Sequence, residues 1–120
     1  MIKDNHLAAL RGLNPVADAV ARAHEAAPDL KVEVEADTLE QAEAAAAAGA
    51  DIILLDNMTP QMLREAVALI DGRSQTEASG GITLESVRAV AETGVNYISV
   101  GALTHSAVAV DIAMDFSPTP

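Results

Sequence analysis

The sequence predicts an α/β fold in which short parallel strands alternate with helices, as either part of a barrel or a doubly wound sheet. Short apolar segments alternate along the chain with segments of helical periodicity, which is the pattern of repeated βα units. A strand of about five residues and a helix of about eleven residues each span roughly 16 Å. Each helix can therefore return the chain to the start of the next strand.

The predicted strands are segments 31–35, 52–56, 75–79 and 97–101. Segment 52–56 (IILLD) is the clearest, because such an apolar run is typical of a strand buried on both faces of a parallel sheet. Segments 31–35 and 75–79 alternate apolar and polar residues instead. Residues 1–3 would add the end of a fifth strand.

Three predicted helices share a start signal, a threonine that can cap the first turn: Thr38, Thr59 and Thr83. They also share a stop signal, a glycine near the helix end that can adopt the left-handed backbone conformation: Gly49, Gly72 and Gly94. Thr38 and Gln41 have the spacing of a capping box, and Pro60 suits the first helical position after Thr59. A further helix is predicted from Asn14 to about Ala27, with His24 exposed on its surface.

The predicted strands, about four to five, are too few for a closed eight-stranded barrel, which needs roughly 250 residues. The chain has 120 residues, so a barrel built from it would be partial. A partial barrel leaves two open edges and a bare inner face. The isolated chain is therefore expected to be unstable or to oligomerise unless the missing strands are supplied.

The composition indicates a protein that binds neither nucleic acid nor membranes. The chain carries 18 Asp and Glu against 7 Lys and Arg, whereas nucleic acids and anionic membranes favour basic surfaces. No apolar run reaches the roughly 18 residues of a membrane span, and residues 1–6 lack the apolar region of a signal peptide. The chain has no cysteine for disulfide or thiolate chemistry. We expect a cytoplasmic protein.

Almost every predicted strand ends on a polar residue or a glycine, at the edge where α/β barrels bind their ligands. These residues are Lys3, Glu35, Asp56, Ser79, Gly80, Gly81 and Gly101. Glycine lets the backbone approach an anion closely, so the consecutive turns at residues 79–81 and 101–102 predict a phosphate site. The alternative is that the glycines only shape the turns.

Glu35 and Asp56 end neighbouring predicted strands and would project toward one cavity. Two such carboxylates can hold Mg²⁺ directly or through water, or stabilise a cationic transition state such as an oxocarbenium ion. The alternative is a pair of solvated acids at loop entries. Lys3 could bind an anion, although a lone lysine is usually a surface residue. His6 and His105 are expected to make local hydrogen bonds, and their spacing fits no zinc motif.

The sequence resembles the quinolinate phosphoribosyltransferase family, also called the carboxylating nicotinate-nucleotide pyrophosphorylases, over essentially the whole chain. The matching motifs are IKDNH (residues 2–6), VEVE (32–35), LLDNM (54–58), EASGG (77–81) and GVNYISVGALTHS (94–106). Their order and approximate spacing agree with the family. One departure is Asn96, where the family more often has aspartate.

The resemblance implies an incomplete α/β barrel and a separate N-terminal α/β sandwich domain. Residues 1–120 would be the C-terminal part of the barrel catalytic domain, a partial parallel βα barrel of about four to five strands, with the sandwich domain and the first barrel strands absent. The implied reaction converts quinolinate and phosphoribosyl pyrophosphate into nicotinate mononucleotide, pyrophosphate and CO₂, with Mg²⁺, in NAD synthesis. The full-length enzyme would be a homodimer or a higher oligomer.

The resemblance also implies roles for single residues. Lys3 would contact anionic substrate groups, and Glu35 and Asp56 would lie at the ribose and the Mg²⁺. The 5′-phosphate would be bound by Ser79, Gly80, Gly101 and His105. Two alternatives stay open: a relative in the same fold family linked to molybdenum transport, and a non-catalytic remnant that keeps a phosphate pocket.

The charges near the predicted site do not match such anionic substrates. Quinolinate and phosphoribosyl pyrophosphate need arginine and lysine clamps, and only Lys3 lies near the predicted site. In the family, the basic cluster comes from segments before the IKDNH motif. The isolated chain is therefore expected to have little or no activity.

Overall fold

The central element of the fold is a parallel sheet of four strands. The computed structural model describes residues 1–10, 14–105 and 108–116, so Ser106, the last residue of the GALTHS string, lies outside the described residues. The strands are β1 (Glu33–Ala36), β2 (Ile52–Asp56), β3 (Gln75–Ser79) and β4 (Tyr97–Ile98). They pair in chain order, β1-β2-β3-β4.

The strand order decides between the two predicted architectures. A doubly wound sheet reverses its strand order at a switch point, whereas barrel strands follow one another in chain order. Every neighbouring pair of strands here is parallel and consecutive. Ile2 adds a parallel bridge to Val34 beside β1, as predicted for the end of a fifth strand. The chain is a partial parallel βα barrel, which does not close within the described ranges.

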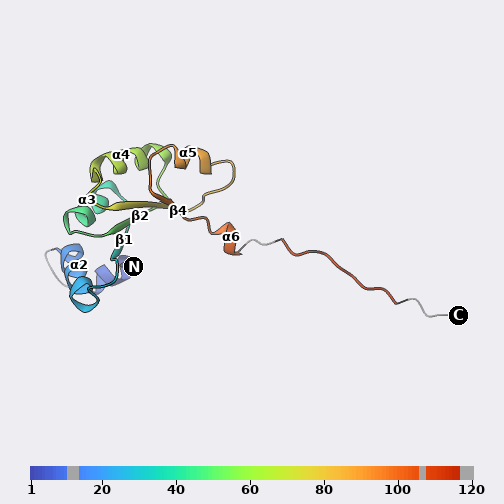
Figure 1. Cartoon of the computed structure of the whole chain (residues 1–120), viewed down its shortest axis with the longest axis horizontal. Coiled ribbons are helices and arrows are strands. Elements are labelled where there is room, and N and C mark those ends of the chain that lie inside the picture. Colours follow the sequence, from blue (N-terminus) through green and yellow to red (C-terminus); the bar gives the residue numbers. More distant parts are fainter. Residues whose placement is uncertain (11–13, 106–107, 117–120) are drawn as a thin grey trace.

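The helices are α1 (Asp4–Ala9), α2 (Pro15–Ala26), α3 (Leu39–Ala47), α4 (Pro60–Ile70), α5 (Val87–Ala91) and α6 (Ala102–His105). The helices that contribute buried residues to the core are α2 to α5, whereas α1 and α6 bury no residue. Figure 1 shows α3, α4 and α5 along the same side of the strands. The strand residues that pack in the core with these helices are Val34, Ala36, Ile53, Leu55 and Ala78. Because side chains alternate along a strand, the residues between them point to the opposite face.

The predicted helix signals are confirmed at α3 and α4. The Thr38 hydroxyl accepts a hydrogen bond from the Gln41 amide at 3.2 Å, and the Gln41 side chain accepts one from the Thr38 amide at 3.1 Å. Thr59 caps α4 by accepting from the Met62 amide at 3.3 Å. The predicted stops Gly49, Gly72 and Gly94 all have positive φ.

Four sequence-based expectations were wrong in detail. The helix expected after Thr83 begins only at Val87, because Thr83 and Ser86 hydrogen-bond each other in a turn. The expected strand 97–101 ends at Ile98, and that at 31–35 is shifted to Glu33–Ala36. His24 is not simply exposed, since its Nε2 lies 3.3 Å from the Gly49 carbonyl oxygen. Helix α1 was not predicted, and its first turn contains His6, whose Nδ1 accepts from the Lys3 amide.

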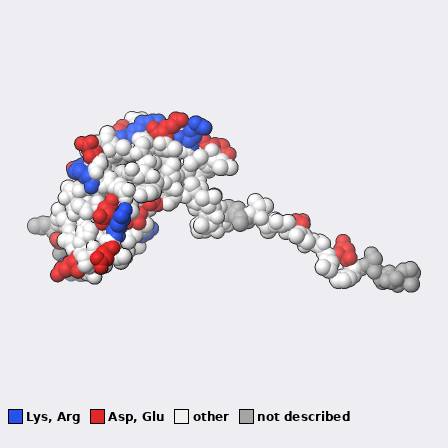
Figure 2. All heavy atoms as spheres, in the orientation of Figure 1, with Lys and Arg blue, Asp and Glu red and all other residues white. Residues whose placement is uncertain are grey.

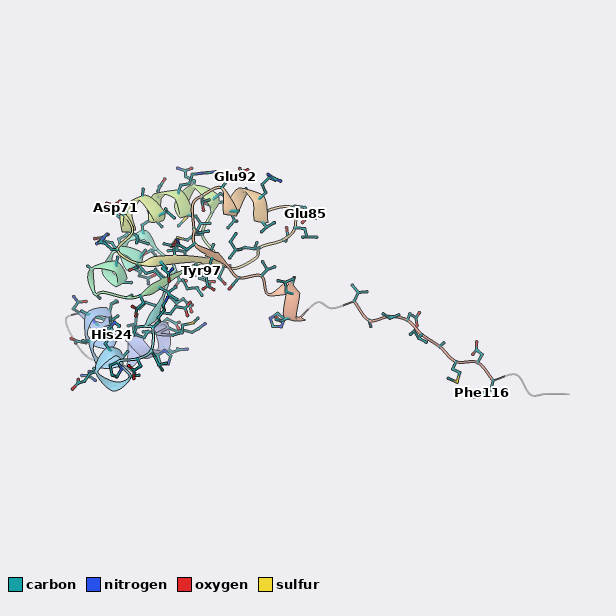
Figure 3. The ribbon with its side chains drawn as sticks, in the orientation of Figure 1. His24, Asp71, Glu85, Glu92, Tyr97 and Phe116 are labelled. Carbon is teal, nitrogen blue, oxygen red and sulfur yellow. The ribbon has the colours of Figure 1, made fainter. Side chains whose placement is uncertain are left out.

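Residues 108–116 leave the body of the molecule as an extended segment (Figure 1). Every second residue in it is a large apolar residue that is highly exposed: Val108, Val110, Ile112, Met114 and Phe116. Figure 2 shows this segment as mostly uncharged surface, and Figure 3 shows Phe116 far from Tyr97 in the sheet. In the part of the chain that the structure describes, no helix has the length and apolarity that crossing a bilayer requires.

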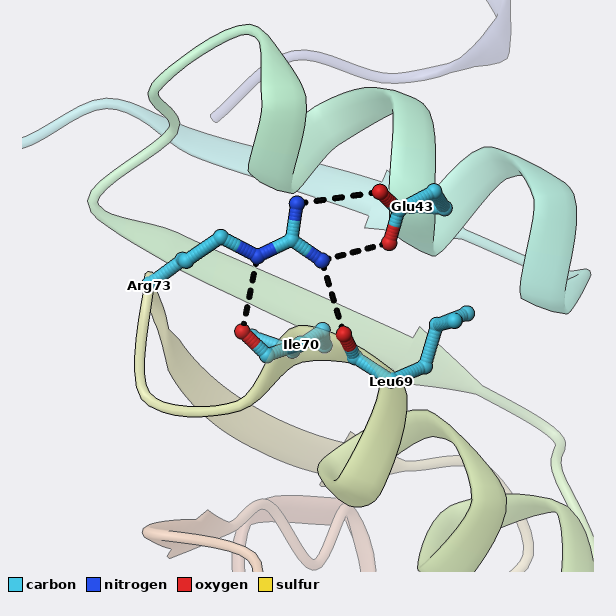
Figure 4. Close-up of polar contacts among 4 residues, drawn as sticks. All are labelled: Glu43, Leu69, Ile70 and Arg73. Carbon is cyan, nitrogen blue, oxygen red and sulfur yellow. Dashed lines mark hydrogen bonds and ion pairs between the residues drawn. The ribbon is translucent and has the colours of Figure 1, made fainter.

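Arg73, in the loop after α4, connects this helix to α3 through hydrogen bonds (Figure 4). Its guanidinium donates to both carboxylate oxygens of Glu43, at 2.9 and 2.5 Å. It also donates to the Ile70 carbonyl at 3.0 Å and to the Leu69 carbonyl at 2.7 Å, which are carbonyls of the last turn of α4. The pairing with Arg73 lowers the pKa of the Glu43 carboxyl.

Replacing Arg73 by methionine is expected to lower the melting temperature by a few degrees. The change removes the Glu43 pair and leaves the carbonyls at the end of α4 without their donor. Thermal unfolding followed by circular dichroism measures the effect. Arg64→Met is the matched control, because the hydrogen bond that Arg64 makes among the described residues is one long contact of 3.4 Å, to the Pro60 carbonyl. Equal melting temperatures for the two variants would contradict the proposal that Arg73 stabilises the packing of α4 against α3.

Candidate active site

The strand residues that alternate with the buried core residues carry the predicted site. On β1 these are Glu33 and Glu35, on β2 Asp56, and on β3 Glu77 and Ser79, all partly buried. Strand pairing aligns Glu35 with Leu54 and Leu54 with Glu77, and it aligns Asp56 directly with Ser79. Because the strands are parallel and in register, their carboxyl ends bring these polar side chains to one edge of the sheet.

An acidic cluster forms where β1 and β2 end. Glu35, Asp37 and Asp56 can each place one carboxylate oxygen within 4.8 Å of the others. Carboxylate oxygens are the ligands that Mg²⁺ and Ca²⁺ prefer in proteins. The structure therefore brings together Glu35 and Asp56, as expected from the sequence, and adds Asp37, which was not predicted.

Lys3 joins the cluster from the segment beside β1. Its ammonium lies 2.8 Å from Glu35 Oε2, and this hydrogen bond raises the pKa of Lys3. The Lys3 side chain is 51% exposed, whereas that of Glu35 is 17% exposed. The lysine therefore remains open to an anionic ligand from the solvent side while its partner is held in the sheet.

The glycine turn after β3 lies next to Asp56. Ser79 pairs with Asp56 across the sheet, and Gly80 and Gly81 follow with φ values of +91° and +60°. A small cavity of about 140 Å³ adjoins this turn, and its lining includes Ser79, Gly80 and Gly81 of the turn together with the core residues Leu63 and Val90. Pockets for drug-sized ligands are usually about 300–1,000 Å³, so this cavity suits a single small group.

The two predicted residues after β4 lie apart from the acidic cluster. Gly101 precedes the single turn of α6, and the His105 ring packs close to it. His105 is exposed, and within the described ranges it makes no polar contact with Lys3, Glu35, Asp56 or Ser79. The role of Gly101 and His105 stays a prediction.

A larger cavity of about 410 Å³ lies at the opposite ends of the strands. Its charged side chains are engaged in structural contacts: Lys31 donates to Gln75 at 2.9 Å, and Asp51 accepts from the Val32 amide at 2.7 Å. In α/β barrels this amino-terminal end serves stability rather than chemistry. The acidic edge is therefore the better candidate for the active site.

Sequence reasoning missed further polar groups beside the acidic cluster. Glu77 accepts a hydrogen bond from Ser99, and Glu33 has one buried carboxylate oxygen with no hydrogen-bond partner among the described residues. Both residues could have been found from the alternating pattern of apolar and polar residues in segments 31–35 and 75–79. This pattern places Glu33 on the same face as Glu35, and Glu77 on the same face as Ser79.

Burial raises the pKa of the Glu33 carboxyl, and repulsion from Glu77 adds to the effect. A raised pKa in the folded state means that protonated Glu33 favours folding, and that this contribution is lost as pH rises through the folded-state pKa. Glu33→Gln is therefore expected to raise the melting temperature at pH 7 by a few degrees and to change it little near pH 4. Thermal unfolding in the presence of EDTA tests this without a bound cation.

The matched control is Glu25→Gln, which alters an exposed acid on α2. It is expected to leave the melting temperature nearly unchanged at both pH values. A lower melting temperature for Glu33→Gln at pH 7 would contradict the destabilising charge assigned to Glu33.

Comparisons with known proteins agree on one family. The model of the quinolinate phosphoribosyl transferase C-terminal domain matches residues 1–115. The chain is 50% identical over 116 residues to the probable nicotinate-nucleotide pyrophosphorylase (carboxylating) of Bacillus subtilis (strain 168), covering 96% of this chain and 39% of that protein. It is 46% identical over 118 residues to the nicotinate-nucleotide pyrophosphorylase (carboxylating) of Mycobacterium leprae (strain TN), covering 96% of this chain and 40% of that protein.

A solved structure agrees with the sequence relatives. The structure of NadC from Streptococcus pyogenes superposes with a TM-score of 0.81 at 44% identity, covering 97% of this chain and 40% of that chain. The chain thus spans about two fifths of the length of the relatives it matches.

Proposed function

Because the chain belongs to the quinolinate phosphoribosyltransferase family, we propose that residues 1–120 form the C-terminal part of its α/β-barrel catalytic domain. The proposed reaction joins quinolinate to phosphoribosyl pyrophosphate, releasing pyrophosphate and CO₂ and giving nicotinate mononucleotide, in NAD synthesis. The similarity to two nicotinate-nucleotide pyrophosphorylases supports this choice of pyridine nucleotide chemistry. We further propose that the complete enzyme is cytoplasmic and acts as a homodimer or a higher oligomer.

The observation that carries the proposal is the acidic cluster of Glu35, Asp37 and Asp56 with Lys3 beside it. Transfer of a ribosyl group develops positive charge on the sugar ring as the pyrophosphate leaves. Carboxylates fixed near the anomeric carbon stabilise that charge in the transition state. We assign this role to Glu35 and Asp56.

The same carboxylates fit a divalent cation. They are hard oxygen donors within 4.8 Å of one another, and the described residues place only Lys3 as a cation among them. Glu35, Asp37 and Asp56 would hold Mg²⁺, which when bound neutralises charge on the pyrophosphate leaving group. Lys3 would then be released from Glu35 to contact an anionic substrate group.

We propose that the glycine turns bind the 5′-phosphate. Ser79 and Gly80 adjoin the acidic cluster through the pairing of Ser79 with Asp56, and the positive φ of Gly80 supports a close approach of backbone to an anion. Gly101 and His105 would complete this subsite from the start of α6.

Recognition of quinolinate requires more cations than this edge offers. Among the described lysines and arginines, Arg73 is held by Glu43 at the amino-terminal ends of the strands, and Arg88 on α5 lies 3.9 Å from Glu92. A dianionic substrate needs bidentate or multiple cationic contacts. We therefore propose that the cations for quinolinate come from outside residues 1–120, and that these residues alone bind the donor without turnover.

Titration calorimetry of phosphoribosyl pyrophosphate in the presence of Mg²⁺ tests this proposal. The folded chain is expected to bind the donor saturably, and the mixture with quinolinate is expected to form no nicotinate mononucleotide. Glu35→Gln should weaken donor binding, whereas Glu92→Gln, which alters an exposed acid on the helix side, should not. A chain that unfolds cooperatively but binds no donor would refute the proposed site.

A further inference from the structure

Asn57, the residue after Asp56, has an unusual backbone conformation. Its φ is +53°, and the other described non-glycine residue with positive φ is Asp71, at +49°. Asp71 ends α4 as its C-cap, where a left-handed residue is common. Asn57 instead lies between β2 and the Thr59 cap of α4, so no helix end accounts for it. Asparagine adopts this conformation more readily than most residues, and non-glycine residues in it cluster at active sites.

The contacts of Asn57 connect the two halves of the candidate site. Its side-chain amide donates to Asp56 Oδ2 at 2.5 Å. Its backbone amide donates to the Ser79 carbonyl at 2.9 Å, which ties the residue to the end of β3. One oxygen of Asp56 is thus held by Asn57, and the carboxylate is fixed in orientation toward Glu35 and Asp37.

This arrangement is possible because Gly80, as a glycine, has no side chain. A Cβ atom at Gly80 would overlap Asn57 Oδ1 and would lie 2.6 Å from Asn57 Cγ and 2.8 Å from Asn57 N. Both distances are below normal contact, and the nitrogen belongs to the backbone. The space beside Gly80 is therefore occupied by the asparagine that orients Asp56.

We propose that Asn57 is a positioning residue for the Asp56 carboxylate, and that Gly80 must be glycine because it accommodates the Asn57 side chain. This inference rests on the proposed function, in which Asp56 binds the divalent cation and the ribose. It assigns to Gly80 a steric role in addition to any contact with phosphate. The strained backbone of Asn57 is retained because it directs the amide onto Asp56.

Asn57→Gly separates positioning from structure. Glycine adopts positive φ without strain, so the variant is expected to melt at the same temperature as the unmodified chain or slightly above it. Loss of the amide is expected to weaken Mn²⁺ binding by about ten-fold, as measured by electron paramagnetic resonance. A residue with only a structural role would not lower affinity while preserving stability.

Asp71→Gly is the matched control, because it relaxes the same backbone conformation away from the site. It is expected to leave Mn²⁺ affinity unchanged. Mn²⁺ affinity of Asn57→Gly within two-fold of the unmodified chain would overturn the positioning role. Absence of Mn²⁺ binding to the unmodified chain would instead refute the proposed cation site.

A double-mutant cycle tests the contact without any ligand. Gly80→Ala is expected to lower the melting temperature when Asn57 is present, and to lower it clearly less in the Asn57→Gly background. Some loss remains in both backgrounds, because alanine is also strained at the φ of +91° of Gly80. Additive melting-temperature losses would show that the Gly80–Asn57 packing does not exist and would overturn the inference even if no cation binds.

Discussion

Replacing Asp56 by asparagine is expected to weaken binding of Mn²⁺, used as a probe for Mg²⁺, by about a hundred-fold. Asparagine keeps the shape of the side chain but removes one negative charge from the three carboxylates of the cluster. The Lys3 ammonium lies next to the cluster and already repels a bound cation. The two carboxylates that remain in the variant would therefore attract Mn²⁺ only weakly. The hydrogen bond from Asn57 also loses its charged acceptor.

Electron paramagnetic resonance of Mn²⁺ titrations measures this loss directly. Asp111→Asn is the control, because it removes the same charge from the exposed segment beyond α6. The control separates loss of a ligand from loss of net charge. An affinity loss of less than about three-fold for Asp56→Asn would show that Asp56 is a solvated acid rather than a ligand.

Replacing Leu55 by alanine is expected to cost about 2–5 kcal/mol of unfolding free energy. Leu55 is fully buried in the core between the sheet and the helices. Single domains are stabilised by only about 5–15 kcal/mol, and we expect an open barrel with unpaired edges to lie at the lower end of that range. The variant should therefore be largely unfolded near body temperature, and the site edge formed by β2 should be lost with it.

Urea unfolding followed by circular dichroism checks the expected loss at Leu55. Leu84→Ala is the matched control, because Leu84 is 90% exposed and its truncation should change the free energy of unfolding by no more than about 0.5 kcal/mol. Equal urea midpoints for the two variants would mean that the sheet does not pack on the helices as described.

Much of the fold could be predicted because local signals and burial agree. Residues 52–55 are apolar in a row, and the caps Thr38 and Thr59 precede amphipathic helices, so strand and helix are both favoured locally. The start of α5 could not be predicted from Thr83. A turn in which Ser86 pairs with Thr83 competes with helix formation there.

The candidate site could be predicted in part for the same reason. Glu35 and Asp56 follow from their position at strand ends, and the structure brings them together. Asp37 lies just beyond β1, so the pattern of the strand did not indicate it. The link between Asn57 and Gly80 depends on two backbone conformations with positive φ, which no sequence period encodes.

The most direct test of the proposed role of residues 1–120 is the steady-state rate of nicotinate mononucleotide formation by a chimera. Residues 1–115 of this chain would replace the matching residues of the Bacillus subtilis relative, which would supply its own remaining segments. The chimera is expected to form the product with a kcat/KM within about ten-fold of that relative, and Asp56→Asn is expected to lower this value by about a hundred-fold or more. A folded chimera that makes no product, or one whose rate is unchanged by Asp56→Asn, would contradict the proposed catalytic role.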